Sequence, residues 1–194
     1  MRAADFLDWA VSRPDPERWE LSGGVPVPMA VERIRHNLLK TEVALELGLS
    51  ARRVADGDCR VFGDGVSIVV DDDTVYEPDA AVQCGGTVDP DAVALDRPVI
   101  VVEVLSPSTA YRDTGEKLEA YLGLPSVRHY LVLDPVRRVA VHHGREDASG
   151  PTVTAIRHGG TLELPPTGLS IDLDACFAAV PAAEPPPGDA TAVE

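Results

Sequence analysis

One strand-like run, residues 99–105, constrains the fold of this chain more than any other feature. Every position in the run is apolar except Glu103, and such near-continuous apolar character predicts a central strand buried on both faces. An ionised glutamate in a strand of this kind is costly to bury without a partner. A second carboxylate, Asp79, lies in another β-like run at 75–82, directly after Pro78. Both carboxylates therefore need positive charge nearby, from a side chain or from a metal ion.

The remaining segments indicate a mixed α/β chain. Helices are predicted at 4–12, at 31–50 and in a segment that begins near Asp113. A hairpin of two short strands is predicted around Gly23-Gly24, within 19–29. Further strands are predicted at 59–62, 66–70, 130–133, 139–142, 152–156 and 162–164. A long loop is predicted from 83 to 97, and residues 169–177 are predicted to close the domain.

Two of these helices carry polar residues with more than one interpretation. In the helix at 31–50, the apolar series at helical spacing is Ile34, Leu38, Leu45 and Leu49. Another face of the same helix carries Arg33, His36, Asn37 and Lys40. This second face is either solvated, which is the interpretation we favour, or an edge that contacts phosphates. In the later helix, Asp113 and Glu116 fit an acidic form of the capping box.

The net charge of −15 limits the classes of function. Proteins that coat nucleic acid without specificity depend on Lys and Arg, so the charge argues against that class, whereas it does not exclude a metal-dependent nuclease. No apolar run approaches the ~20 residues that span a bilayer, and the first residues lack the apolar core of a signal peptide. Cys59, Cys84 and Cys176 show no CxxC spacing, which predicts reduced thiols in a cytoplasm and no disulfide or zinc site.

Asp79 and Glu103 together predict a site for a divalent cation. Their separation fits two neighbouring strands joined by a long loop, so that both carboxylates project from one end of the sheet. An ion there would take one oxygen from each carboxylate and the backbone carbonyl of Val104, a set that suits Mg²⁺ and also Mn²⁺. Lys117, on the following helix, would orient or help deprotonate the attacking water.

A purely structural interpretation of the same residues stays open. Asp79 would then simply end a strand, and Glu103 would pair with an arginine such as Arg60 or Arg97. Lys117 would form a surface ion pair with Asp113, worth roughly a few tenths of a kcal/mol.

Several short elements, found in order, resemble one family. The series PD…EV followed by SPST…RD…K…Y is similar to the Uma-two family of restriction endonucleases, within the PD-(D/E)XK nuclease superfamily. The segments FLDWA, WEL-x-GG and RHYLVLDP extend the resemblance over roughly residues 4–175. The resemblance implies a restriction-endonuclease-like fold, with a mixed central sheet flanked by helices and an extra N-terminal helix and hairpin. It also implies Mg²⁺-dependent phosphodiester hydrolysis, with Asp79 and Glu103 as metal ligands.

The chain departs from the superfamily pattern at one position. The lysine two residues after the glutamate is absent, and Leu105 stands there. The resemblance implies that Lys117 replaces that lysine from the following helix. Glu20 and His36 match a glutamate and a helix histidine of the family, although Glu20 could be structural and His36 a surface residue. Asp113 is a further accessory candidate.

The expected organisation is a single domain at 1–180, followed by a disordered Pro/Ala/Glu-rich tail at 181–194. The expected function is that of a Mg²⁺-dependent endonuclease acting on DNA in the cytoplasm. No membrane partner is expected, and the protein could form a homodimer. The alternative is a catalytically silent relative of the nucleases that acts as a binding module.

Overall fold

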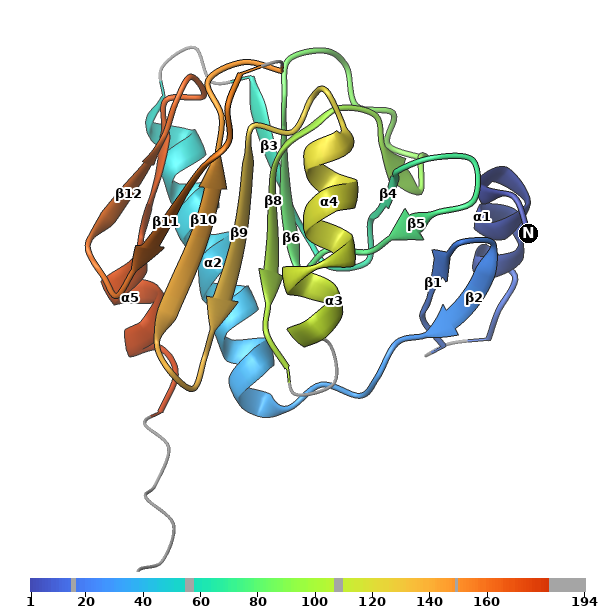
Figure 1. The fold of residues 1–194 in the computed structure, drawn as a ribbon, viewed down its shortest axis with the longest axis horizontal. Coiled ribbons are helices and arrows are strands. Elements are labelled where there is room, and N and C mark those ends of the chain that lie inside the picture. The colour runs from blue at the N-terminus through green and yellow to red at the C-terminus, as the bar shows by residue number, and fades with distance from the viewer. Residues whose placement is uncertain (15–16, 55–57, 107–109, 149, 182–194) are drawn as a thin grey trace, which may run out of the picture.

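The computed structural model describes residues 1–14, 17–54, 58–106, 110–148 and 150–181, arranged around a six-stranded sheet (Figure 1). The helices are α1 (Ala3–Val11), α2 (Ile34–Arg53), α3 (Ala110–Thr114), α4 (Glu116–Gly123) and α5 (Leu173–Ala178). The strands are β1 (Trp19–Ser22), β2 (Val25–Pro28), β3 (Cys59–Gly63), β4 (Ser67–Val69), β5 (Val75–Tyr76), β6 (Ala80–Cys84), β7 (Ala94–Leu95), β8 (Pro98–Val104), β9 (His129–Asp134), β10 (Val139–Gly144), β11 (Val153–Arg157), β12 (Thr161–Leu164) and β13 (Leu169–Asp172). The predicted tail lies outside the described residues, apart from Pro181.

The central sheet has the order β11-β10-β9-β8-β6-β3. Strand β8 pairs in parallel with β9 and antiparallel with β6, so the sheet is mixed. Six of the seven residues of β8 are buried, as its apolar sequence predicts. The predicted fold class, a mixed sheet flanked by helices, is confirmed.

Helices cover both faces of this sheet (Figure 1). Because side chains alternate along a strand, Ile100, Val102 and Val104 contribute to the core layer that contains α2. Val101 points to the opposite layer, where it joins Tyr121 of α4. Glu103 lies two residues after Val101 and points to the same face of the sheet. Strand β8 therefore presents its only charged side chain to the α4 face.

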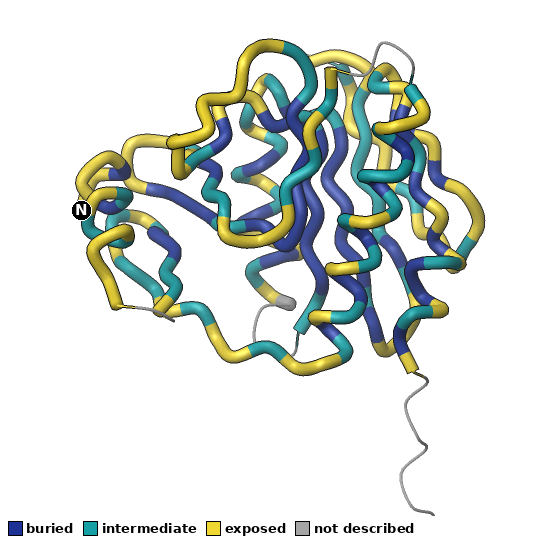
Figure 2. Tube along the Cα trace, turned by 180° about the vertical axis from the view of Figure 1, so that it is seen from behind, coloured by how far each residue is buried: buried dark blue, intermediate teal, exposed yellow. Residues whose placement is uncertain are grey.

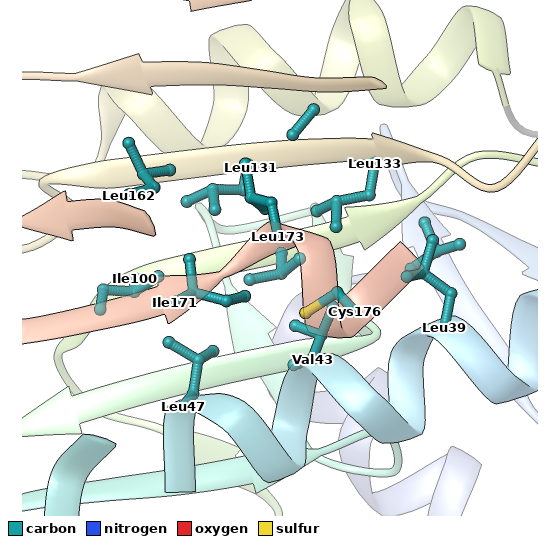
Figure 3. Close-up of a cluster of buried hydrophobic side chains, with 14 of the residues drawn as sticks. Leu39, Val43, Leu47, Ile100, Leu131, Leu133, Leu162, Ile171, Leu173 and Cys176 are labelled. Carbon is teal, nitrogen blue, oxygen red and sulfur yellow. The ribbon is translucent and has the colours of Figure 1, made fainter. Parts of the chain in front are cut away.

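The core on the α2 side is the larger of the two (Figure 3). Leu39, Val43 and Leu47 of α2 are fully buried, and they pack in one cluster with Leu131 and Leu133 of β9. Burying an aliphatic side chain of this size contributes about 1.5–3 kcal/mol. Figure 2 shows the central strands buried along most of their length, while exposed residues occupy the periphery.

The prediction of which face of the second helix, α2, is buried is wrong. Ile34 is 80% exposed and Leu45 is 50% exposed. The buried positions of α2 are His36, Leu39, Lys40, Val43, Leu47 and Ser50. The solvated-face interpretation is therefore wrong for His36 and Lys40, because charged partners at the end of the sheet compensate for their burial.

The N-terminal helix and hairpin form as predicted. The hairpin β1–β2 turns at Gly23 and Gly24, whose φ angles of 54° and 78° favour glycine. Leu21 of β1 pairs with Val75 of β5 and joins the second sheet, which has the order β2-β1-β5-β4-β7. Strand β7 lies within the segment predicted as a loop, and it pairs in parallel with β4. This unit positions Glu20 beside the central sheet.

The prediction of reduced thiols is wrong for two of the three cysteines. Cys59 and Cys84 are cross-strand partners on β3 and β6, and they form a disulfide. Only the strand register brings these residues together, and the spacing of cysteines along the chain does not reveal it. Cys176 is free and buried. None of the described helices combines the length and apolarity that a membrane span requires.

Two stacked histidines link the start of β9 to β10. His129 Nε2 lies 2.7 Å from the Pro165 carbonyl and therefore donates to it, which leaves His129 Nδ1 to accept from His142 Nε2 at 2.9 Å. Burial and the neighbouring His129 lower the pKa of His142 to about 4, and burial lowers the pKa of His129. Both rings are thus neutral in the folded protein.

This histidine pair predicts that the fold loses stability in acid. The unfolded histidines take up protons near pH 6.5 and the folded ones only at lower pH, so stability falls as pH drops from 7 towards 4. Because His142 is partly exposed, we discount the full shift and expect His142 to contribute about 1 kcal/mol of the loss between pH 7 and pH 5. Urea unfolding of His142→Gln should show a loss smaller by that amount. The exposed His158→Gln is the control, and equal losses in both variants would contradict the assignment.

Candidate active site

A pocket of about 520 Å³ lies where β8 ends. Its carboxylates are Glu20, Glu32, Glu77, Asp79 and Glu103. Its basic residues are Arg33, Arg35, His36, Arg112 and Lys117. The residues come from β1, from the segment before α2, from α2, from the turn before β6, and from the β8–α4 region. The pocket is therefore assembled from parts of the chain that only folding brings together.

Asp79 and Glu103 face each other across two paired strands. Ala80 of β6 pairs with Val102 of β8, and one further step of this antiparallel register places Asp79 opposite Glu103. Cross-strand partners share one face of a sheet, and both side chains line the pocket. Asp79 Oδ2 also accepts a hydrogen bond of 2.7 Å from the Val104 amide. The structure thus brings together the two carboxylates that the sequence singled out.

Lys117 is the cation that compensates for the burial of Glu103. Its Nζ lies 2.8 Å from Glu103 Oε1 and 2.9 Å from Glu20 Oε1. All three side chains are about 95% buried. The Tyr121 hydroxyl donates a second hydrogen bond to Glu103 Oε1, at 3.1 Å. Glu103 therefore pairs with Lys117 and not with Arg60 or Arg97.

A helix break at Gly115 sets the position of Lys117. The predicted capping box is wrong, because Asp113 lies inside α3 and Gly115 precedes α4 without a side-chain cap. A Cβ at residue 115 would lie 3.0 Å from the Tyr111 carbonyl, a close approach that glycine allows. Asp113 Oδ1 lies 3.8 Å from Lys117 Nζ, but this pair is buried and is not the predicted surface pair.

Burial and the charge of Lys117 have opposite effects on the pKa of Glu103, and burial and the neighbouring carboxylates have opposite effects on the pKa of Lys117. Burial raises the pKa of Glu103, Lys117 opposes the rise, and the neighbouring Asp79, Asp113 and Glu20 add to it. Burial acts to lower the pKa of Lys117, but Glu103 and Glu20 outweigh it and raise that pKa. Carboxylates outnumber cations around Lys117, so its ammonium is held charged.

Arg112 is a second cation of the pocket. Its Nη2 lies 2.9 Å from Glu20 Oε2, and its guanidinium carbon lies 5.5 Å from the centre of the Tyr76 ring. Glu20 thereby holds Lys117 through one oxygen and Arg112 through the other. The guanidinium side chain is about one quarter exposed towards the pocket.

His36 lies on the other side of Asp79. Its Nε2 lies 2.8 Å from the Val104 carbonyl and 3.4 Å from Asp79 Oδ2, while Nδ1 lies 3.6 Å from Glu32 Oε2. Burial acts to lower the pKa of His36, but Asp79 and Glu32 raise it overall. One ligand atom from each of Glu32, His36 and Asp79 lies within 4.8 Å of the others, a grouping that could hold a metal ion.

Lys40 holds Glu32 in place. Lys40 Nζ contacts Glu32 and lies 2.7 Å from Asp64 Oδ2. Arg18, which precedes β1, pairs with Asp64 at 2.8 Å and also with Glu77. These ion pairs join the N-terminal unit to α2 and to the β3–β4 turn.

Sequence reasoning missed Arg112, Glu32 and Tyr121. The RD and Y of the motif series include Arg112 and Tyr121, and this was the only signal for them. Glu32 lies four residues before His36, a helical spacing that could have paired them.

A mixed sheet flanked by helices, with two carboxylates and a buried lysine where its central strand ends, is typical of the restriction-endonuclease-like fold. Residues 3–175 match the family described as "Uma2: Putative restriction endonuclease", and the chain therefore belongs to the Uma2 family, as its motifs predict. This membership implies a nucleic acid substrate.

Two known proteins are similar to this chain over most of its length. The crystal structure of a "putative nuclease belonging to DUF820" from Anabaena variabilis matches with a TM-score of 0.71 at 15% identity, over 93% of this chain and 99% of that one. This match confirms the fold. The "Uncharacterized protein slr1290" of Synechocystis sp. is 25% identical over 175 residues, which are 89% of each chain.

The buried cluster predicts an asymmetry in stability. Lys117→Met leaves three carboxylates without their shared ammonium, and this should cost about 3–5 kcal/mol of unfolding free energy. Glu103→Gln leaves Lys117 with Glu20 and Asp113 and should cost about 1 kcal/mol. Urea unfolding at neutral pH in EDTA measures both values.

Lys40→Met is the matched control for loss of a buried ammonium. Its partners Glu32 and Asp64 are more exposed and also contact Arg18, so its cost should lie below that of Lys117→Met. A larger loss in Glu103→Gln than in Lys117→Met would refute this account of the cluster.

Proposed function

We propose that this chain is a Mg²⁺-dependent endonuclease that hydrolyses phosphodiester bonds, with DNA as its substrate. One observation carries the proposal: Asp79 and Glu103 share one face of the sheet in an open pocket, with the Lys117 ammonium against Glu103. Membership of the Uma2 family supports the same reaction.

The donor set fits a hard divalent cation. Asp79, Glu103 and the Val104 carbonyl would supply oxygen ligands for Mg²⁺, which takes few carboxylates and keeps several waters. His36 Nδ1 is buried without a hydrogen-bond partner among the described residues, and imidazole extends the fit to Mn²⁺. When bound, the cation supplies Lewis-acid activation of the phosphodiester and of the attacking water.

Lys117 acts through the positive charge of its ammonium and not as a general base. Because its pKa is raised, the ammonium stays protonated and can donate to the attacking water or to a phosphoryl oxygen, where negative charge develops. Its hydrogen bond to Glu103 keeps that carboxylate oriented. Of the two roles expected from the sequence, to orient the water or to help deprotonate it, the raised pKa of Lys117 supports orientation.

Arg112 would receive the phosphate. Guanidinium groups bind phosphate oxygens through paired N–H donors, and Arg112 lines the pocket beside Lys117. Glu20 would act as a positioning residue, because its two oxygens fix Lys117 and Arg112 relative to each other.

The two proposed metal ligands make the cation favourable for substrate binding. The pocket carries as many basic residues as acids, but Asp79 and Glu103 lie at the proposed metal position, and without a cation they would repel a phosphodiester there. Nucleic acid affinity should therefore increase when the divalent cation is present.

The alternative function is that of a catalytically silent binding module. The specific observation in its favour is that Glu103 already has a cationic partner within the protein, the Lys117 ammonium at 2.8 Å. Metal-independent binding of a partner without cleavage would favour it.

The proposal predicts metal-dependent cleavage that needs both carboxylates. Supercoiled plasmid, linear duplex, single-stranded DNA and RNA should be tested with Mg²⁺ or Mn²⁺, and EDTA should abolish activity. Asp79→Asn and Glu103→Gln should each lower the rate by about 10²-fold or more. The exposed Asp91→Asn and Glu163→Gln are matched controls. Wild-type rates in either site variant, or no cleavage of any substrate, would reject the proposal.

A further inference from the structure

A second cavity lies at the opposite edge of the central sheet. Its volume is about 330 Å³, and its polar lining residues are Arg97, Arg128, Ser126 and Thr167. Arg97 directly precedes β8 and Arg128 directly precedes β9, and these two strands are parallel. Their N-terminal ends meet at this edge, whereas their C-terminal ends reach the pocket of Asp79 and Glu103 (Figure 1). Strand β8 separates the two sites by roughly 20 Å.

Arg128 has an unused donor at this cavity. Its Nη1 is buried and has no hydrogen-bond partner in the part of the chain that the structure describes. Buried polar atoms of folded proteins are almost always hydrogen-bonded, so an unpaired guanidinium N–H points to a missing partner. An acceptor beside a cavity would be a group that enters from solvent.

Arg97 is held over the same cavity by the backbone. Gly86 has φ of 75°, and a Cβ there would lie 2.5 Å from Arg97 Nη2, so the guanidinium rests directly on this glycine. Arg97 Nε lies 3.4 Å from a carboxylate oxygen of Asp96. Among the described residues that line the cavity there is no Asp or Glu.

Positive charge accumulates at this edge of a strongly acidic protein. Arg145 donates to the backbone carbonyls of Val127 and Leu124, and neither contact neutralises its charge. Burial and the nearby Arg128 lower the pKa of Arg145. Arg97, Arg128 and Arg145 thus gather at this edge of a chain whose net charge is −15, with Asp96 beside Arg97 and Asp147 near Arg145.

We propose that Arg97 and Arg128 form a binding site for a phosphate group, carried by a ligand no larger than a mononucleotide. Two guanidinium groups and the Ser126 hydroxyl supply donors that match phosphate oxygens, and the cavity volume suits a ligand of that size. The phosphate could belong to a free nucleotide or to the 5′ end of a nucleic acid. This site is separate from the proposed nuclease pocket and does not depend on its activity.

Calorimetry in EDTA tests the site without any contribution from a bound metal. Pyrophosphate and AMP should bind the full-length protein. Arg128→Gln should weaken both by at least about tenfold, and Arg97→Gln should weaken them severalfold. Glu103→Gln and the exposed Arg137→Gln should bind like the wild type. Competition of AMP with an oligonucleotide, 5′-phosphorylated or not, identifies the source of the phosphate.

The controls keep the result decisive. If Arg128→Gln does not fold, as judged by thermal melting, Arg97→Gln and Arg128→Lys decide, because Lys retains the charge and should retain part of the affinity. The proposal is overturned if the wild type binds neither pyrophosphate nor AMP at millimolar concentration. It is equally overturned if the folded arginine variants bind like the wild type.

Discussion

The ion pair between Glu103 and Lys117 is the interaction on which the site depends. A carboxylate near the end of a strand that is buried at six of its seven residues can be tolerated only where a cation lies beside it. The break at Gly115 starts α4 one residue before Lys117, and α4 covers the face of the sheet to which Glu103 points. Glu20 completes the cluster from β1, so the N-terminal hairpin is part of the site and not an appendage.

The surrounding charges support the proposal of a metal-dependent reaction. Lys117 contacts Glu20, Glu103 and Asp113. Burial, together with the neighbouring Asp113 and Glu20, keeps the pKa of Glu103 high although Lys117 acts to lower it. A divalent cation would relieve the repulsion that the protein's own cations leave. The acidic chain is consistent with such a site, because the positive charge needed for a nucleic acid can come from the ion and from a few placed arginines.

Much of the fold and part of the site could be predicted from the sequence. The apolar run around Glu103 predicts the central strand, and the spaced motifs predict Asp79, Glu103 and Lys117 as neighbours in the pocket. The orientation of α2 could not be predicted, because the burial of His36 and Lys40 also depends on Asp79 and Asp64, which are distant in sequence. The disulfide of Cys59 and Cys84 depends on the register of β3 and β6, which no local pattern encodes.

The most direct test of the account is the position of a bound metal ion. Crystals grown with millimolar Mn²⁺ would locate the ion by its anomalous scattering, without any assumption about activity. The account predicts one ion with carboxylate oxygens of both Asp79 and Glu103 at about 2–2.5 Å. An ion held by Glu32, His36 and Asp79 without Glu103, or no ion in the pocket, would contradict it.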